Sequence, residues 1–328
     1  MKKETRKEKK KSSGFFIHKG DTKGEILRKI VFFVSLIVFI VTVVDIAFYY
    51  LNPLWQQKKL NDNVKDYHSS NSEDYYSDKI NPKFLSLYKK NKDIIGWITI
   101  DGTNIDYPVM QSKKDEYYLR RGFDKEYSRE GSIFASKYSS IKYKKESKNI
   151  MLYGHHMVST GTMFKQLDKY LDLKFYKKHP NITFDSLYRD GEYKIFAVFI
   201  TNAIKSQDNG NFFDYQKTSF PTDEDFAEWI NEARTRSIIK TGVSISKKDE
   251  ILTLQTCNDS FESEDEKARL IIMARRTRKG EEKTTDTSSA TLNKNPKYPQ
   301  IWYDTKKLEN PYKTEATTSE TTTKSSEK

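Results

Sequence analysis

The feature that most constrains this chain is a long apolar run near its N-terminus, "IVFFVSLIVFIVTVVDIAFYYL" (Ile30–Leu51). As a helix it would span about 33 Å, enough for a hydrocarbon core of about 30 Å. Eleven Lys/Arg and four acidic residues precede it in residues 1–29, so the positive-inside rule predicts a cytoplasmic N-terminus and an exported remainder. A cleaved signal peptide is the alternative, but its apolar core is normally only about 7–15 residues long. We therefore expect a retained, single-pass membrane anchor.

The formal net charge of +12 raises the question of nucleic-acid binding. However, residues 1–29 alone carry +7, residues 280–328 are balanced, and only about +5 remains between them. The sequence has no zinc-finger spacing, no basic helix with heptads and no aromatic RNA-binding strand. The charge pattern indicates a membrane surface, and no nucleic acid, as the partner of the basic segment.

The exported part alternates short β-rich runs with turn signals from about residue 94, and one amphipathic helix is expected at about 222–236. This pattern predicts a mainly β fold, a mostly antiparallel barrel or sandwich. The Thr/Ser/Lys/Glu-rich end of the chain buries too little apolar surface to fold alone. We expect five segments: a basic cytoplasmic segment (1–29), a transmembrane helix (30–51), a stalk (52–78), a catalytic domain (79–279) and a disordered tail (280–328).

The only cysteine of the chain, Cys257, ends the strand pattern "ILTLQTC". A free cysteine is often a small buried hydrophobe. In an exported protein, however, a single unpaired cysteine indicates intermolecular pairing or a reactive thiol. Alternation along the strand puts Thr253, Gln255 and Cys257 on one face and Leu252 and Leu254 on the other. The pattern therefore predicts a thiol on the polar face at the end of a strand.

A histidine and an arginine could complete a nucleophilic site. His155 and His156 follow the strand pattern "NIMLY" and Gly154, a glycine that would let the backbone turn sharply so that an imidazole can reach a cleft. Surface histidines and a metal site are the alternatives, although adjacent histidines diverge and no third ligand is near in sequence. Arg269 begins the apolar pattern "ARLIIMA", where an arginine is costly unless it faces a site or an acid. The arginines at the other end, Arg275, Arg276 and Arg278, are interpreted as a solvated strand end.

These residues together resemble the sortase family. "TLQTC" resembles the family's cysteine motif, "YGHHM" its histidine motif, and "ARLIIMAR" the position of its arginine. The stretch Tyr107–Phe134 and the helix at 222–236 are similar to class B sortases. The resemblance covers residues 80–278 and implies a closed β-barrel with an N-terminal helix and a helix between the last strands, behind the single transmembrane helix.

The resemblance also implies a mechanism. Cys257 would attack the carbonyl of a sorting motif in a secreted protein, His155 would transfer protons, and Arg269 would stabilise the oxyanion. Asp259 matches an acid suggested as a triad member in the class, but Arg269 is preferred because an acid beside a thiolate opposes its formation. The implied substrate-binding residues are Leu119, Gln255 and Thr256, where Gln255 departs from the serine frequent in the class. No cofactor and no metal are implied.

The implied acceptor is an amine of the cell wall, on a peptidoglycan precursor or stem peptide, and the catalytic domain would be extracellular. A pilin-polymerising sortase and a non-catalytic surface scaffold on the same barrel remain alternatives. A hydrolytic cysteine protease is a third alternative, although the "CGSCW" context of papain-like enzymes is absent.

Overall fold

The computed structural model describes residues 15–68, 75–208, 212–258 and 268–312, which form two compact units, Met1–Lys58 and Lys59–Lys328. The first unit is dominated by helix α1, Lys23–His68. Thr22 and Glu25 exchange hydrogen bonds at its start, as in a capping box.

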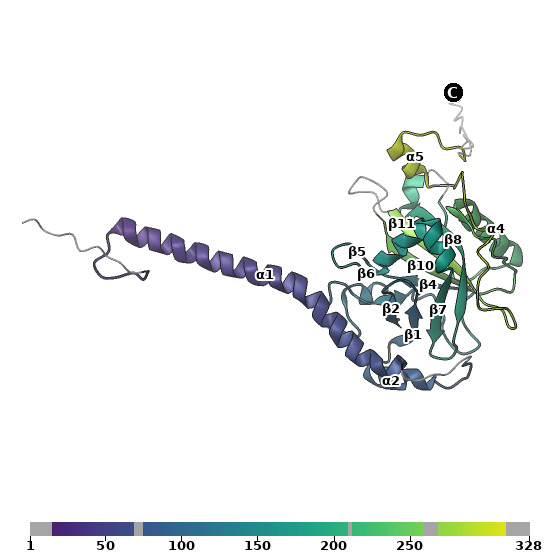
Figure 1. Cartoon of the computed structure of the whole chain (residues 1–328), viewed down its shortest axis with the longest axis horizontal. Coiled ribbons are helices and arrows are strands. Elements are labelled where there is room, and N and C mark those ends of the chain that lie inside the picture. Colours follow the sequence, from purple (N-terminus) through teal and green to yellow (C-terminus); the bar gives the residue numbers. More distant parts are fainter. Residues whose placement is uncertain (1–14, 69–74, 209–211, 259–267, 313–328) are drawn as a thin grey trace, which may run out of the picture. The chain divides into compact units, whose positions relative to one another are not determined.

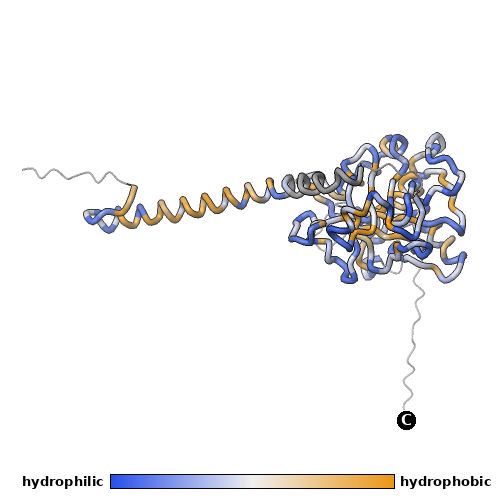
Figure 2. The backbone as a smooth tube through the Cα atoms, turned by 90° about the horizontal axis from the view of Figure 1, so that it is seen from below, coloured by the Kyte–Doolittle hydropathy of each residue, from blue (hydrophilic) through white to orange (hydrophobic). Residues whose placement is uncertain are grey.

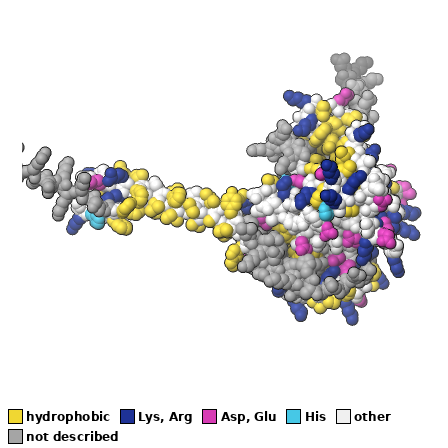
Figure 3. Space-filling view, in the orientation of Figure 1, with side chains coloured by type: hydrophobic (Ala, Val, Ile, Leu, Met, Phe, Trp, Pro, Cys, Tyr) yellow, Lys and Arg dark blue, Asp and Glu magenta, His cyan; other side chains and the backbone are white. Residues whose placement is uncertain are grey.

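The side chains of the apolar part of α1 are largely exposed. Its residues are coloured as hydrophobic along most of the helix in Figures 2 and 3. Residues Lys23–Asn52 are long and apolar enough to cross a membrane, a property that an N-terminal signal sequence shares. The apolar helix expected near the N-terminus is thus present, and α1 continues through His68 into the residues expected to form a stalk.

The second unit is a closed barrel of eight strands (Figure 1). Around the barrel, in order of pairing, the strands are β1 (Ile94–Thr99), β2 (Asp106–Met110), β3 (Ile133–Ala135), β4 (Asn149–Tyr153), β10 (Ile251–Cys257), β11 (Ala268–Arg276), β8 (Glu192–Asn202) and β7 (Asn181–Ser186), which pairs with β1. Only β2–β3 and β4–β10 are parallel. The expectation of a mainly β, mostly antiparallel closed barrel is confirmed.

Alternation along each strand divides the apolar residues between two faces of the sheet. Leu252, Leu254, Leu270 and Ile272 belong to the cluster that fills the barrel. The outward residues of the same strands, such as Met273, pack instead under helix α4 (Asp223–Arg236). The helix expected between the last strands is therefore confirmed, and it buries the outer face of β8, β10 and β11.

The remaining elements lie in the connections. They are η1 (Pro82–Phe84), α2 (Leu85–Lys90), η2 (Tyr117–Arg120), β5 (His156–Met157), β6 (Thr162–Met163), η3 (Phe164–Leu171), α3 (Leu173–Lys178), η4 (Lys205–Asp208), β9 (Ile239–Lys240), β12 (Thr291–Leu292) and α5 (Gln300–Lys306). Before α2, Asn81 caps η1, and buried Lys83 lies 2.6 Å from Asp185 and 2.7 Å from Asp190. These ion pairs attach the N-terminal helices of the barrel unit to β7 and to the turn before β8.

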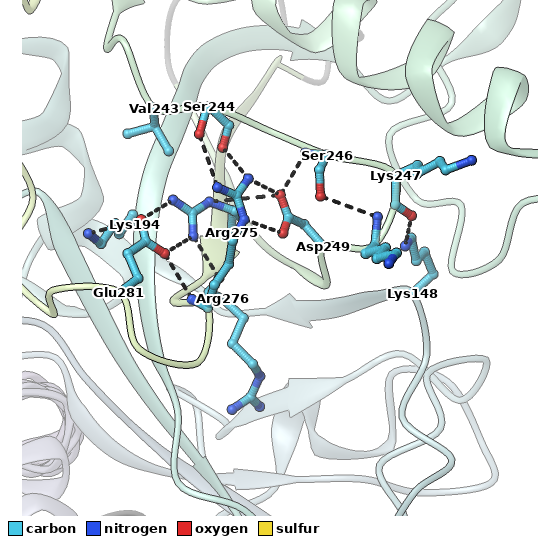
Figure 4. Close-up of polar contacts among 12 residues, drawn as sticks. Lys148, Lys194, Val243, Ser244, Ser246, Lys247, Asp249, Arg275, Arg276 and Glu281 are labelled. Atoms are coloured by element: carbon cyan, nitrogen blue, oxygen red, sulfur yellow. Dashed lines mark hydrogen bonds and ion pairs between the residues drawn. The ribbon is translucent and has the colours of Figure 1, made fainter.

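The end of β11 differs from the sequence interpretation. Arg275 and Arg276 are buried, with 1% and 6% of their surface exposed. Arg275 binds Glu281 through two hydrogen bonds of 2.5 and 2.7 Å, and these hydrogen bonds lower the pKa of Glu281 well below its ordinary value (Figure 4). Arg278 makes a similar bidentate contact with Asp249. The solvated strand end expected here is wrong for Arg275 and Arg276, because acids contributed by neighbouring loops compensate these two arginines, whereas Arg278 is exposed.

The expectation of disorder from residue 280 onward is also wrong for the residues described. Within 280–312, β12 pairs with β9, α5 forms a helix after Pro299, and Ala290 and Tyr303 are buried. The composition alone predicted too little apolar burial, but the barrel supplies the surface against which this segment packs. The remaining tail residues lie outside those described.

Candidate active site

The register of three neighbouring strands brings the predicted catalytic residues to one level of the barrel. Cys257 lies directly opposite Arg269 in the antiparallel pair β10–β11. In the parallel pair β4–β10, Tyr153 lies opposite Gln255, and a hydrogen bond of 3.1 Å from the Gly154 amide to the Gln255 carbonyl continues the ladder. His155, two residues after Tyr153, therefore reaches the level of Cys257, two residues after Gln255.

The three residues also share a face of the sheet. Met151 on β4 and Ile271 on β11 point outward into the cluster under α4. His155 lies four residues after Met151 and Arg269 lies two residues before Ile271, so both project outward as well. Cys257 is exposed and unpaired. The face predicted from the alternation of β10 is confirmed, and the thiol is accessible rather than part of the core.

The imidazole of His155 is held by a backbone carbonyl. Its Nε2 lies 2.9 Å from the carbonyl oxygen of Leu119 in η2. Because a carbonyl oxygen only accepts, Nε2 carries the hydrogen and Nδ1 is left as the basic nitrogen of the neutral ring. Burial lowers the pKa of His155, and the nearby positive charge of Arg120 lowers it further, against the effect of the Leu119 hydrogen bond. The ring is therefore mainly neutral at neutral pH and can accept a proton.

Gly154 has a packing role beside this histidine. A Cβ at this position would lie 2.6 Å from Cδ1 of Ile133 and 2.6 Å from ring atoms of Phe164. The sequence interpretation, a glycine needed for a sharp turn, is replaced by a closer reason: only a residue without a side chain lets the chain pass between these two. The amide of Phe164 then donates to the carbonyl of His155 at 2.9 Å.

The adjacent histidine has a different environment. Nε2 of His156 lies 2.8 Å from a carboxylate oxygen of Asp168 in η3. Burial alone would raise the pKa of Asp168, but the hydrogen bonds from His156 and Lys165 lower it below its ordinary value. His156 thus links the β5–β6 hairpin to η3. The two histidines of "YGHHM" differ in their partners, which are a backbone carbonyl for His155 and a carboxylate for His156.

Arg269 combines a fixed position with an unused donor. One terminal nitrogen donates to the carbonyl of Ala268 at 2.9 Å. Its Nε is buried and has no hydrogen-bond partner among the residues that the structure describes. A buried guanidinium donor without a partner is costly, so this nitrogen is a candidate to bind an oxygen of a substrate.

The predicted substrate-binding residues occupy three different environments. Leu119 is half-buried and contributes its carbonyl to His155. Gln255 is half-buried on the same face as Cys257. Thr256 is buried, and its hydroxyl donates to the carbonyl of Gly154 at 2.9 Å. Thr256 therefore holds β10 to the chain before His155, and a role of these three residues in substrate binding stays a prediction.

Sequence reasoning missed two residues beside the site. The hydroxyl of Tyr215 donates to Oε1 of Gln255 at 2.9 Å, and Nε2 of Gln216 donates to the same oxygen at 3.2 Å. Burial raises the pKa of Tyr215, which therefore stays a neutral donor. Tyr215 and Gln216 lie in an irregular segment without periodicity, so no sequence signal pointed to them. Asp259, the alternative to Arg269, lies outside the described residues.

Comparisons with known proteins give the family. The sortase domain family matches residues 98–277. Sortase B of Staphylococcus aureus (strain NCTC 8325 / PS 47) is 38% identical over 200 residues, which are 61% of this chain and 77% of that protein. The solved Staphylococcus aureus sortase B–substrate complex matches with a TM-score of 0.60 and 32% identity, over 70% of this chain and 99% of that one. A solved sortase B in complex with triglycine matches with a TM-score of 0.59 and 33% identity, over 69% and 99%.

The chain therefore belongs to the sortase family and is a cysteine transpeptidase. Its relatives in both comparisons are sortases B, and its domain is of class B. The family predicted from the cysteine, histidine and arginine motifs is confirmed.

Proposed function

We propose that this protein is a membrane-anchored sortase that cleaves a sorting motif in secreted proteins and joins the acyl part to an amine of the cell wall. The observation that carries the proposal is the alignment of His155, Cys257 and Arg269 at one level and on one face of β4, β10 and β11. That arrangement offers a nucleophile, a base and an oxyanion partner to a single carbonyl group.

In the first step, Nδ1 of His155 accepts the thiol proton and Sγ of Cys257 attacks the motif's carbonyl carbon. The tetrahedral oxyanion is stabilised by the guanidinium of Arg269. The C–N bond then breaks, the imidazolium gives its proton to the leaving amine, and a thioester with Cys257 remains. The lowered pKa of His155 suits this sequence, because the ring must start neutral.

In the second step, the incoming amine loses a proton to His155 and attacks the thioester. A new amide forms and Cys257 leaves as the thiol. The solved relative in complex with triglycine supports a glycine amine as acceptor, and the solved sortase B–substrate complex supports a sorting motif as donor. A peptidoglycan precursor or stem peptide would supply such an amine, whereas a pilin lysine would make the protein a pilin polymerase.

The proposed location of the catalytic domain rests on the apolar helix and on the charges that precede it. The apolar segment of α1 is long enough to act as an anchor, and the basic residues before it favour a cytoplasmic N-terminus. The catalytic domain then lies outside the cell, where secreted proteins and wall amines occur together. Fractionation with N-terminal sequencing of the mature protein distinguishes a retained anchor from a cleaved signal peptide.

The experiment is a cleavage assay on a peptide library, with mass spectrometry of the protein to detect the thioester. Cys257→Ala should abolish both cleavage and the thioester while leaving the fold intact, and His155→Gln should reduce turnover by at least about a hundredfold. His156→Gln is the matched control, because its partner is Asp168 and it should retain activity. Full activity of Cys257→Ala would refute the proposal and leave a non-catalytic scaffold.

The acceptor is tested in the same assay. Adding triglycine should convert the hydrolysed product into the triglycine conjugate, and a lysine side-chain peptide should not compete. Hydrolysed product alone, at saturating amine, would favour a cysteine protease. Preferential use of the lysine peptide would favour pilin polymerisation.

A further inference from the structure

The segment 281–312 adds a layer to the barrel beyond the residues that match the family. The family match ends at residue 277, yet this segment packs on the same unit as the barrel (Figure 1). Its helix α5 contacts η4, which follows the end of β8. That end of β8 pairs with the start of β11, where Arg269 lies. Helix α5 therefore packs at the active-site end of the barrel, whereas the start of the segment, at Glu281, binds Arg275 at the other end of β11.

Two polar contacts join this segment to the barrel. The amide of Gln300, at the start of α5, donates to Asp208 in η4 at 2.6 Å, and both residues are buried. Nζ of Lys297 lies 2.9 Å from Oε1 of Glu232 on α4. The same carboxylate oxygen lies 2.8 Å from Nε of Arg236, whose side chain is fully buried. Arg236 and Lys297 thus share one carboxylate, and Asp208, which interacts with both cations, brings the group to two positive and two negative charges.

Arg236 extends this set of contacts toward the active site. Its guanidinium lies 5.3 Å from the centre of the Phe213 ring, within range of a cation–π interaction. Phe213 also packs on Trp229, which donates to the carbonyl of Asp214 at 2.9 Å. The next residue is Tyr215, whose hydroxyl binds Gln255, two residues before Cys257.

We propose that Lys297 is a positioning residue for transpeptidation: through Glu232 and Arg236 it supports the segment Phe213–Gln216, and Tyr215 of that segment orients Gln255 beside Cys257. The proposal rests on the proposed function of Cys257 as nucleophile. Lys297 itself touches no reacting atom. Its effect is on how accurately the sorting peptide and the thiol are placed, since small displacements at such sites reduce turnover.

The test measures kcat and KM for a cleaved sorting peptide with the full chain carrying Lys297→Met. This change keeps most of the aliphatic side chain and removes the charge. We expect kcat/KM to fall about three- to tenfold, the range for remote residues coupled to a site. Lys297→Arg should restore most of the loss. Lys294→Met is the matched control, because Lys294 is exposed and has no ion pair in the described part of the chain.

A double-mutant cycle separates positioning from general stability. Tyr215→Phe removes only the hydroxyl that binds Gln255. If Lys297 acts through Tyr215, Lys297→Met should lower kcat/KM less than about twofold in the Tyr215→Phe background. A thermal unfolding curve for each variant confirms that the assay temperature lies below the transition.

Two results would overturn the inference: kcat/KM of Lys297→Met equal to that of Lys294→Met, or the same loss with and without the Tyr215 hydroxyl. Neither result affects the proposed function, because every variant in this comparison retains Cys257. Failure of the proposed function appears separately, as activity that persists in Cys257→Ala.

Discussion

The packing of Gly154 gives a quantitative prediction about the catalytic histidine's neighbour. In Gly154→Ala the new methyl group would lie 2.6 Å from both Ile133 and Phe164, whereas ordinary contacts are 3.4–4 Å. Both neighbours are fully buried, so the strain must be relieved by displacing the chain between Tyr153 and His155. Overpacking of this kind costs about 1–3 kcal/mol. For a domain of this size, that lowers Tm by about 3–10 °C.

The assay combines thermal unfolding with peptide cleavage. We expect Gly154→Ala to lose both stability and kcat, because the displaced segment carries His155. Phe164→Leu should recover part of the stability of Gly154→Ala, since the two sites share one contact. Gly122→Ala is the control: there the new methyl group meets the exposed carboxylate of Asp124 at 3.1 Å and Cβ of Ser128 at an ordinary 3.9 Å. Equal stability and equal kcat of the two alanine variants would refute the packing argument.

Three further predictions concern charged groups. Burial lowers the pKa of His155 and the base must be neutral, so kcat/KM should rise with pH through a midpoint below 6.5. Arg120→Met should move that midpoint upward, because it removes a nearby positive charge. A midpoint above 6.5 in the parent protein would contradict this reasoning. Glu281→Gln should destabilise the fold by about 1–3 kcal/mol, because Arg275 loses its partner. Because the pKa of Glu281 is lowered in the folded protein, its contribution to the free energy of unfolding is present above its ordinary pKa of 4.5 and is lost as pH falls. The parent protein and Glu281→Gln should therefore converge in stability in acid. A stability difference that is independent of pH would argue against the ion pair. Lys83→Met should cost about 3–5 kcal/mol in urea unfolding, since it removes the buried cation that Asp185 and Asp190 share, and a loss below about 1 kcal/mol would contradict that account.

The residues that sequence reasoning placed correctly are those with local signals. The apolar run of α1, the alternation that exposes Cys257, and the amphipathic helix at 222–236 each follow from a pattern among residues close together in the sequence. The catalytic candidates came from motifs that resemble a family, because no local pattern relates His155 to Cys257 across the long stretch of chain between them.

The misplaced residues are those whose surroundings come from distant parts of the chain. Arg275 and Arg276 resemble a solvated strand end until Glu281 and other loop acids are added. The polar segment after residue 280 resembles a disordered tail until the barrel offers it a surface. Composition measures what a segment can bury by itself, and it contains no information about what a partner surface adds.

The sequence by itself determined an apolar helix, a set of alternating strands and one thiol at a strand end, because these depend on neighbours along the chain. Tertiary structure alone decided that β4, β10 and β11 lie side by side, which aligns His155, Cys257 and Arg269, and that helix α5 packs at the same end of the barrel. The physical reason is that strand pairing and loop docking are contacts between residues remote in sequence, whose geometry exists only once the barrel has closed.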